Sequence, residues 1–295
     1  MNAPSLHERA LGAYLGLAVG DALGATVEFM TSREIAVTYR VHREIIGGGW
    51  LHLKPGQVTD DTQMSLALGS AIIASPSGWD LHAAADVFVT WMQSRPPDIG
   101  NTCRRGIRRY QQTGSLSSVP SDDEAGNGAA MRNLPVVLST LGNEPAFHDR
   151  SLAQAHITHY HPLSDAAVIT LGDITRAFLR GAPLTAGVCL AHALVADHPS
   201  FKFRPWPGRT SGYVVDTVQT VFDAVFNTDT FEDCLVTVVN RGGDADTTGA
   251  LAGQLAGAFY GIKAIPPRWL KRLDPLVARN IRAQVDALLA LSARP

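Results

Sequence analysis

The sequence is poor in cysteine and has almost no net charge. Its three cysteines, Cys103, Cys189 and Cys234, are widely spaced and odd in number, so they predict neither a disulfide framework nor a zinc site and fit a reducing compartment. The net charge is −2 over 295 residues, which provides no basic field of the kind that attracts nucleic acid. We therefore expect no nucleic-acid partner.

Membrane-spanning runs and strand patterns are also missing. The apolar stretch at residues 11–25 is interrupted by Asp21 and is too short to cross a bilayer. The first residues include His7, Glu8 and Arg9 and have no signal-peptide architecture. With 45% hydrophobic and 18% charged residues, the chain predicts a soluble, cytoplasmic protein with one compact all-α domain over residues 1–295.

Helical patterns account for most of the chain. We expect helices at residues 6–29, 62–75, 80–94, 103–112, 128–141, 163–180, 183–196, 213–226, 231–240, 249–261 and 277–292. Residues 31–58 are predicted to be irregular, because Gly47-Gly48-Gly49 and Pro55-Gly56 are loop signals.

Glycines recur every four residues in the first and in the penultimate of these helices. Such spacing places them on one helix face, where each glycine costs about 1 kcal/mol relative to alanine. Close helix–helix approach is the simplest feature that would offset this cost. The two sets are Gly12, Gly16, Gly20 and Gly24, and Gly249, Gly253, Gly257 and Gly261.

Two acidic segments, each followed by an apolar helix, carry the clearest chemistry. The first is Thr-Asp-Asp-Thr at residues 59–62, and the second is Asn-Arg-Gly-Gly-Asp-Ala-Asp-Thr-Thr-Gly at residues 240–249. Carboxylates and hydroxyls are the hard ligands that Mg²⁺, Mn²⁺ and Ca²⁺ prefer. Capping of the helices would explain either segment alone. Four aspartates exceed that need, and a pair of divalent cations would reconcile their charges.

Further candidates come from other parts of the chain. Glu28, at the end of the first helix, is a site carboxylate or a surface charge, and Asp98, in a proline-stiffened loop, is a site carboxylate or a helix cap. The turn Gly126-Asn127-Gly128 is predicted to open a helix and to present N–H groups suited to phosphate. His159 and His161 do not share a helix face, so we expect one histidine in a cleft and one structural histidine.

Taken together, these motifs resemble the ADP-ribosylglycohydrolase family over nearly the whole chain. The segment at residues 95–106 (Arg-Pro-Pro-Asp-Ile-Gly-Asn-Thr-Cys-Arg-Arg-Gly) is similar in particular to the subgroup that acts on dinitrogenase reductase in nitrogen-fixing bacteria. The other motifs that carry the resemblance are Gly20-Asp21-Ala22-Leu23-Gly24, Glu28-Phe29-Met30, Thr59-Asp60-Asp61-Thr62, Gly126-Asn127-Gly128-Ala129, Thr158-His159 and Gly243-Asp244-Ala245-Asp246-Thr247-Thr248-Gly249.

The resemblance implies an all-helical fold around two divalent cations, Mn²⁺ or Mg²⁺, and removal of ADP-ribose from a modified arginine of dinitrogenase reductase. It assigns catalytic roles to Asp98, Glu28 and Asp61, with Asp246 as the bridging ligand. The metal ligands that it implies are Thr59, Asp60, Asp61, Asp244, Asp246 and Thr247. The substrate contacts that it implies are Asn101, Gly126, Asn127, Gly128, His159 and Tyr213.

The expected chemistry is cleavage of an N-glycosidic bond, which builds oxocarbenium-like charge on the ribose and needs a protonated leaving group. Asp98 or Glu28 would move the proton, and we favour Asp98 because its loop is stiff. Hydrolysis of phosphoesters or of serine- or acetyl-linked ADP-ribose, and binding of ADP-ribose without catalysis, are the alternatives. The resemblance also suggests control by a PII signalling protein and reversible recruitment to a membrane ammonium channel.

Overall fold

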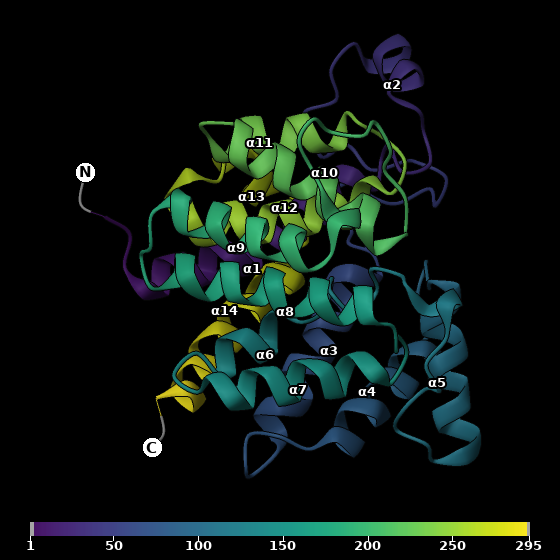
Figure 1. Cartoon of the computed structure of the whole chain (residues 1–295). Helices are drawn as coiled ribbons and strands as arrows, with labels where there is room; N and C mark the ends of the chain where they lie inside the picture. The colour runs from purple at the N-terminus through teal and green to yellow at the C-terminus, as the bar shows by residue number, and fades with distance from the viewer. Residues whose placement is uncertain (1–2, 294–295) are drawn as a thin grey trace.

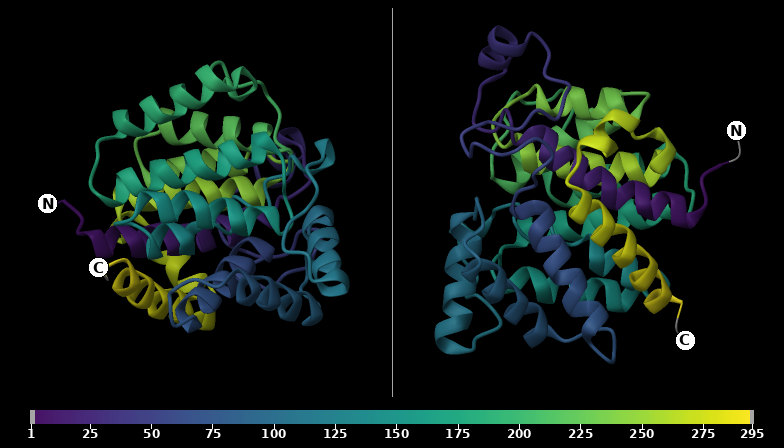
Figure 2. Two further views of the ribbon diagram at one scale, coloured as in Figure 1. Left: turned by 60° about the horizontal axis from the view of Figure 1, so that its bottom comes forward. Right: turned by 180° about the vertical axis from the view of Figure 1, so that it is seen from behind.

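A computed structural model describes residues 3–293 and contains helices joined by loops (Figures 1 and 2). Within this range no strand forms, and the only β-type pairings are three isolated bridges. None of the helices described is long and apolar enough to cross a membrane. The predicted all-α fold is confirmed.

Two helices from opposite ends of the chain form the centre of the molecule. Helices α1 (Leu6–Gly24) and α12 (Ala245–Tyr260) pack against each other along their lengths, and nearly all of their residues are buried. Around α12 lie α8 (Pro162–Leu179), α10 (Val214–Asn227) and α11 (Phe231–Val239). Helix α9 (Leu184–Asp197) covers α8 on the outside (Figure 1).

A second group of helices packs below this centre in Figure 1. Helix α3 (Asp60–Ala74) contacts α4, α6 and α14, and α4 in turn contacts α5. Helix α2 stands apart from the body at one corner of the molecule (Figures 1 and 2). The remaining bounds are α2 (Ser32–Tyr39), α4 (Leu81–Gln93), α5 (Asn101–Thr113), α6 (Leu134–Ser139), α7 (Glu144–His156), α13 (Pro267–Arg272) and α14 (Pro275–Ser292).

The glycines explain how closely α1 and α12 approach. A Cβ atom added at Gly20 would lie 1.9 Å from the carbonyl oxygen of Gly249, and one added at Gly16 would lie 2.2 Å from that of Gly253. Neither distance is possible between non-bonded atoms, so these positions admit no side chain. The close helix packing predicted from the four-residue spacing is confirmed.

Some of the predicted helix bounds are wrong. Helix α1 ends at Gly24 rather than at residue 29, because residues 25–29 form turns that bring Phe29 to φ +62°. The predicted helix at 128–141 is only α6, Leu134–Ser139, so the glycine turn at 126–128 does not open it. Helices α2, α7 and α13 were not predicted, although Thr31 and Glu34 form a capping box at the start of α2.

Candidate active site and metal centre

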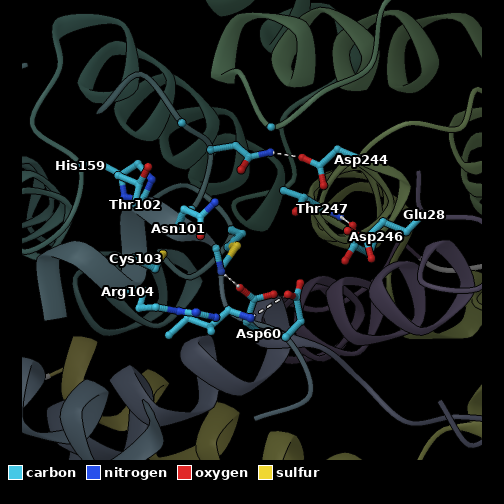
Figure 3. A pocket seen from close by; sticks show the side chains of 18 of the residues that line it. Glu28, Asp60, Asn101, Thr102, Cys103, Arg104, His159, Asp244, Asp246 and Thr247 are labelled. Carbon is cyan, nitrogen blue, oxygen red and sulfur yellow. Dashed lines mark hydrogen bonds between the residues drawn. The ribbon is translucent and has the colours of Figure 1, made fainter. Parts of the chain in front are cut away.

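A cavity of about 510 Å³ lies where the first turns of α3, α5 and α12 meet the end of α1 (Figure 3). Glu28, Asp244 and Asp246 lie along one side of it and His159 on the other (Figure 3). The described residues that line it are Glu28, Phe29, Trp50, Asp60, Asp98, Ile99, Gly100, Asn101, Thr102, Cys103, Arg104, Gly126, Asn127, Gly128, Met131, His159, Gly212, Asp244, Asp246 and Thr247.

Carboxylates distant in sequence converge in this cavity. One oxygen atom each of Glu28, Asp244 and Asp246 lie within 4.8 Å of one another, and the same is true of Asp60, Asp98 and Asp246. Asp246 belongs to both groups. The structure therefore offers two adjoining positions for a cation, with one carboxylate between them.

Asp21 organises the start of α3 from beneath the cavity. This buried carboxylate accepts hydrogen bonds from the Thr59 amide at 3.0 Å, the Thr59 hydroxyl at 2.9 Å and the Thr62 hydroxyl at 2.5 Å. Burial raises the pKa of Asp21 to about 6. Asp21 was not predicted as a site residue. Its hydrogen-bond partner Thr59 lies 38 residues further along the sequence, so no local pattern shows the contact.

The hydrogen bonds of the Asp61 carboxylate indicate whether the site suits a cation. Its Oδ2 atom accepts hydrogen bonds from the Thr59 and Thr247 hydroxyls, both at 3.3 Å. Its Oδ1 atom is buried and has no hydrogen-bond partner. A buried carboxylate oxygen left unpaired is costly, and a cation would satisfy it. The donor set of carboxylates and hydroxyls fits a hard divalent metal ion.

The electrostatics point the same way. Burial, followed by the neighbouring Asp98 carboxyl, raises the pKa of Asp60 to about 8. Burial raises the pKa of Glu28 to about 8 as well, with Asp244 as a further contributor. Burial and the surrounding carboxylates hold the pKa of Asp246 well above its usual range. Bound positive charge would let these groups ionise together.

The predicted phosphate turn is tied to the acidic centre. The side-chain amide of Asn127 donates to Oδ2 of Asp244 and, at 2.9 Å, to the Thr217 hydroxyl. The backbone amide of Asn127 donates to the carbonyl of Gly212 at 3.1 Å, so that N–H group is already engaged. Tyr213 pairs with Gly126 through an isolated bridge and does not line the cavity.

His159 lies buried behind this turn. A Cβ atom added at Gly128 would lie 2.8 Å from Cε1 of His159, and one added at Gly126 would lie 2.9 Å from Nε2. Both glycines are therefore needed to let the turn pass over the ring. Burial, and then the positive charges of Arg132 and Arg105, lower the pKa of His159 to about 3, so the imidazole is neutral near pH 7.

Trp50 is a functional candidate that sequence reasoning missed. Its indole N–H donates to Oε2 of Glu28 at 2.6 Å, and its ring lies 5.3 Å from that of Phe29. Both aromatic side chains are exposed at the mouth of the cavity. Residue 50 lies in a stretch that reads as loop, and no local pattern links it to residue 28.

With this geometry described, comparison with known proteins identifies the class. A family model described as ADP-ribosylglycohydrolase matches residues 2–295. The chain belongs to the ADP-ribosylglycohydrolase family.

Individual relatives are similar over most of their length. The chain is 57% identical over 292 residues to the ADP-ribosyl-[dinitrogen reductase] glycohydrolase of Rhodospirillum rubrum, covering 99% of each chain. It is 35% identical over 286 residues to the ADP-ribosylarginine hydrolase Tri1 of Serratia proteamaculans, covering 90% of this chain and 75% of that protein. A solved structure titled ADP-ribosylglycohydrolase-related protein complex superimposes with a TM-score of 0.86 at 36% identity, covering 98% of this chain and 99% of that one.

Proposed function

We propose that this protein hydrolyses the N-glycosidic bond between ADP-ribose and an arginine side chain of dinitrogenase reductase. The observation that carries the proposal is the convergence of Glu28, Asp60, Asp98, Asp244 and Asp246 in one cavity. The Rhodospirillum relative is named for ADP-ribosylated dinitrogen reductase and the Serratia relative for ADP-ribosylarginine. The first name supports the protein substrate, and the second supports the arginine linkage.

Two divalent cations, Mn²⁺ or Mg²⁺, are the cofactors that we propose. Bound there, they would supply Lewis-acid polarisation of the ribose hydroxyls and of a water molecule. Asp246 belongs to both carboxylate groups, which supports it as the ligand shared by the two cations. The unpaired Oδ1 atom of Asp61 supports that residue as a further ligand. The proposed metal ligands are Thr59, Asp60, Asp61, Asp244, Asp246 and Thr247.

Asp98 and Glu28 are the groups that would move the proton to the leaving arginine. Asp98 accepts a hydrogen bond from the Ile99 amide at 2.7 Å, and Glu28 accepts one from Trp50. Both carboxylates line the cavity and are held by neighbours of their own. Glycosidic cleavage needs such a positioned acid.

The opposite side of the cavity would bind the nucleotide part. Gly126, Asn127 and Gly128 form its wall together with the neutral His159, and Asn101 lies at the first turn of α5. A neutral imidazole can donate a hydrogen bond to a pyrophosphate oxygen without a charge of its own to desolvate. Tyr213, which is exposed just outside, would contact the modified arginine or its protein.

The test is release of ADP-ribose from arginine-modified dinitrogenase reductase. After chelation we expect no release, and we expect it to return when Mn²⁺ or Mg²⁺ is added. A serine-linked ADP-ribose conjugate serves as the comparison substrate. Release from the serine conjugate alone would assign a different leaving group, and tight binding of ADP-ribose without release from either would make the protein a binder.

Regulation through partners is a separate proposal that rests on the subgroup resemblance. A PII signalling protein would bind this enzyme and bring it to a membrane ammonium channel, so that membrane association is reversible. Co-sedimentation with channel-containing vesicles, with and without the PII protein, measures it. Equal recovery of the enzyme with and without both partners would contradict it.

A further inference from the structure

Exposed apolar side chains gather in one segment next to the cavity mouth. Phe29, Val37, Val41, Ile46 and Trp50 are all exposed, and Val37 has 80% of its surface accessible. Large apolar side chains exposed together mark binding surfaces more often than chance exposure does. We call residues 29–50 the arm; it contains α2, which stands apart from the body (Figures 1 and 2).

A groove runs between α2 and the loop at residues 47–50. Thr26, Glu28, Phe29, Met30, Glu34, Thr38, Tyr39, Gly49 and Trp50 line it, and its volume is about 470 Å³. Glu28, Phe29 and Trp50 also line the catalytic cavity. The groove therefore continues outward from the cavity along the arm.

The arm is held in place rather than hanging free. The Phe29 amide donates to the carbonyl of Gly243 at 2.7 Å, and the Gly243 amide donates back to that of Met30 at 2.8 Å. At the far end of α2, the His42 amide donates to the side chain of Asn240 at 2.9 Å, and Asn240 donates back to the carbonyl of His42 at 2.7 Å. Both anchors lie on the loop that carries Asp244, so the groove is preformed relative to the acidic centre.

What fills this groove follows from the substrate. An ADP-ribosylated arginine that enters the cavity remains attached to its polypeptide, which must leave through the mouth. The groove wall combines apolar and aromatic side chains with threonine hydroxyls, and its charged members are the carboxylates of Glu28 and Glu34, with no lysine or arginine among the described lining residues. Such a wall suits a neutral or basic segment with an apolar side chain.

We propose that the arm groove binds the polypeptide segment next to the modified arginine in the protein substrate. This inference rests on the proposed function and adds to it a second binding site, which contacts the polypeptide rather than the ADP-ribose. Val37 is exposed but does not line the groove, whereas Thr38 lines it together with Glu34, four residues earlier on the same face of α2. Thr38 is an exposed contact point that has no part in the catalytic cavity.

The experiment compares a large and a small substrate. Hydrolysis of arginine-modified dinitrogenase reductase and of free ADP-ribosyl-arginine is measured for the wild type, Thr38→Lys and the control Val119→Lys. Val119 is 81% exposed and lines neither cavity nor groove. For Thr38→Lys we expect KM for the protein to rise about tenfold, because the added positive charge opposes a basic segment and fills the groove, with kcat/KM for the free conjugate unchanged. Thr38→Glu, which adds the opposite charge at the same position, should raise KM less.

Each other outcome overturns the inference in a distinguishable way. If Thr38→Lys and Val119→Lys hydrolyse the protein substrate equally well, the groove does not bind the polypeptide, while the proposed function stands. If the wild type hydrolyses neither substrate, the proposed function fails and the inference falls with it. If sedimentation shows a wild-type dimer that Thr38→Lys dissociates, with KM for the protein unchanged, the arm is a contact between two copies of this chain.

Discussion

The inner wall and the outer rim of the candidate site differ in burial, in packing and in backbone conformation. The inner wall consists of α1, α12 and the first turn of α3; there Asp21, Asp61 and Asp246 are buried, and the glycine contacts leave no room for a Cβ atom. The outer rim consists of the arm and the loop at residues 95–101. It exposes aromatic rings and places Phe29 and Arg95 at positive φ, +62° and +58°.

The inner wall fixes the buried carboxylates, whereas the outer rim is the part that would contact the protein substrate. Buried carboxylates keep their positions only if the backbone around them cannot shift, which close packing ensures. A rim that meets a protein surface needs exposed apolar side chains. Left-handed backbone at non-glycine residues costs about 1 kcal/mol or more. Here it turns the chain directly after Glu28 and three residues before Asp98. Substitutions should therefore fail differently in the two regions.

Gly20→Val should have the largest effect, because it attacks the inner wall. Its Cβ atom would lie 1.9 Å from the carbonyl oxygen of Gly249, and neither backbone can yield without separating α1 from α12. We expect the free energy of unfolding to fall by more than about 3 kcal/mol, measured by chemical denaturation. In the control Gly142→Ala, the added atom meets only the Ser292 carbonyl oxygen at 3.3 Å, and stability should hardly change. A stable Gly20→Val protein would mean that the wall is not rigid.

Asp98→Asn should come next, and it separates the rim acid from the inner ligands. The amide cannot donate the proton that the leaving arginine needs, so kcat should fall about 10²- to 10³-fold. Binding of ADP-ribose, followed by calorimetry, should persist, and Mn²⁺ binding should weaken little, because Asp60 and Asp246 remain at the cation position that Asp98 adjoins. Asp61→Asn is the inner-wall counterpart and should weaken Mn²⁺ binding itself. Unchanged turnover by Asp98→Asn would remove this residue from the mechanism and leave Glu28 as the acid.

Trp50→Phe should have the smallest effect. It keeps an aromatic ring against Phe29 but removes the hydrogen bond to Glu28, a contact worth about 1 kcal/mol. We expect kcat/KM to fall about fivefold and stability to stay as it is. Trp91→Phe loses an indole hydrogen bond to Gln63 outside the cavity and should leave kcat/KM unchanged. Equal activity of the two variants would show that Trp50 does not position Glu28.

The same division explains what could be predicted from sequence. The inner wall was accessible because glycine spacing and acidic segments before apolar helices are local patterns with one physical meaning each. In the rim, Asp98 and Asn101 of the loop were predicted as site residues, whereas the arm was missed. Trp50 meets Glu28, and Asn240 meets His42, through contacts that no period or motif encodes. Helix α2 did carry a local signal, the capping box of Thr31 and Glu34, but the loop signals at residues 47–49 and 55–56 led to the whole segment being predicted as irregular.

The pairing of α1 with α12 also has a consequence for how the protein is made. A ribosome completes residues 6–24 long before residues 245–260, so the first helix waits with its glycine face uncovered while most of the chain is synthesised. Until α12 arrives, two of the five carboxylates, Asp244 and Asp246, are absent and neither candidate cation position is complete. A prematurely terminated product is thus inert as a hydrolase, and its unfinished centre marks it for the quality-control machinery that recognises exposed apolar surface.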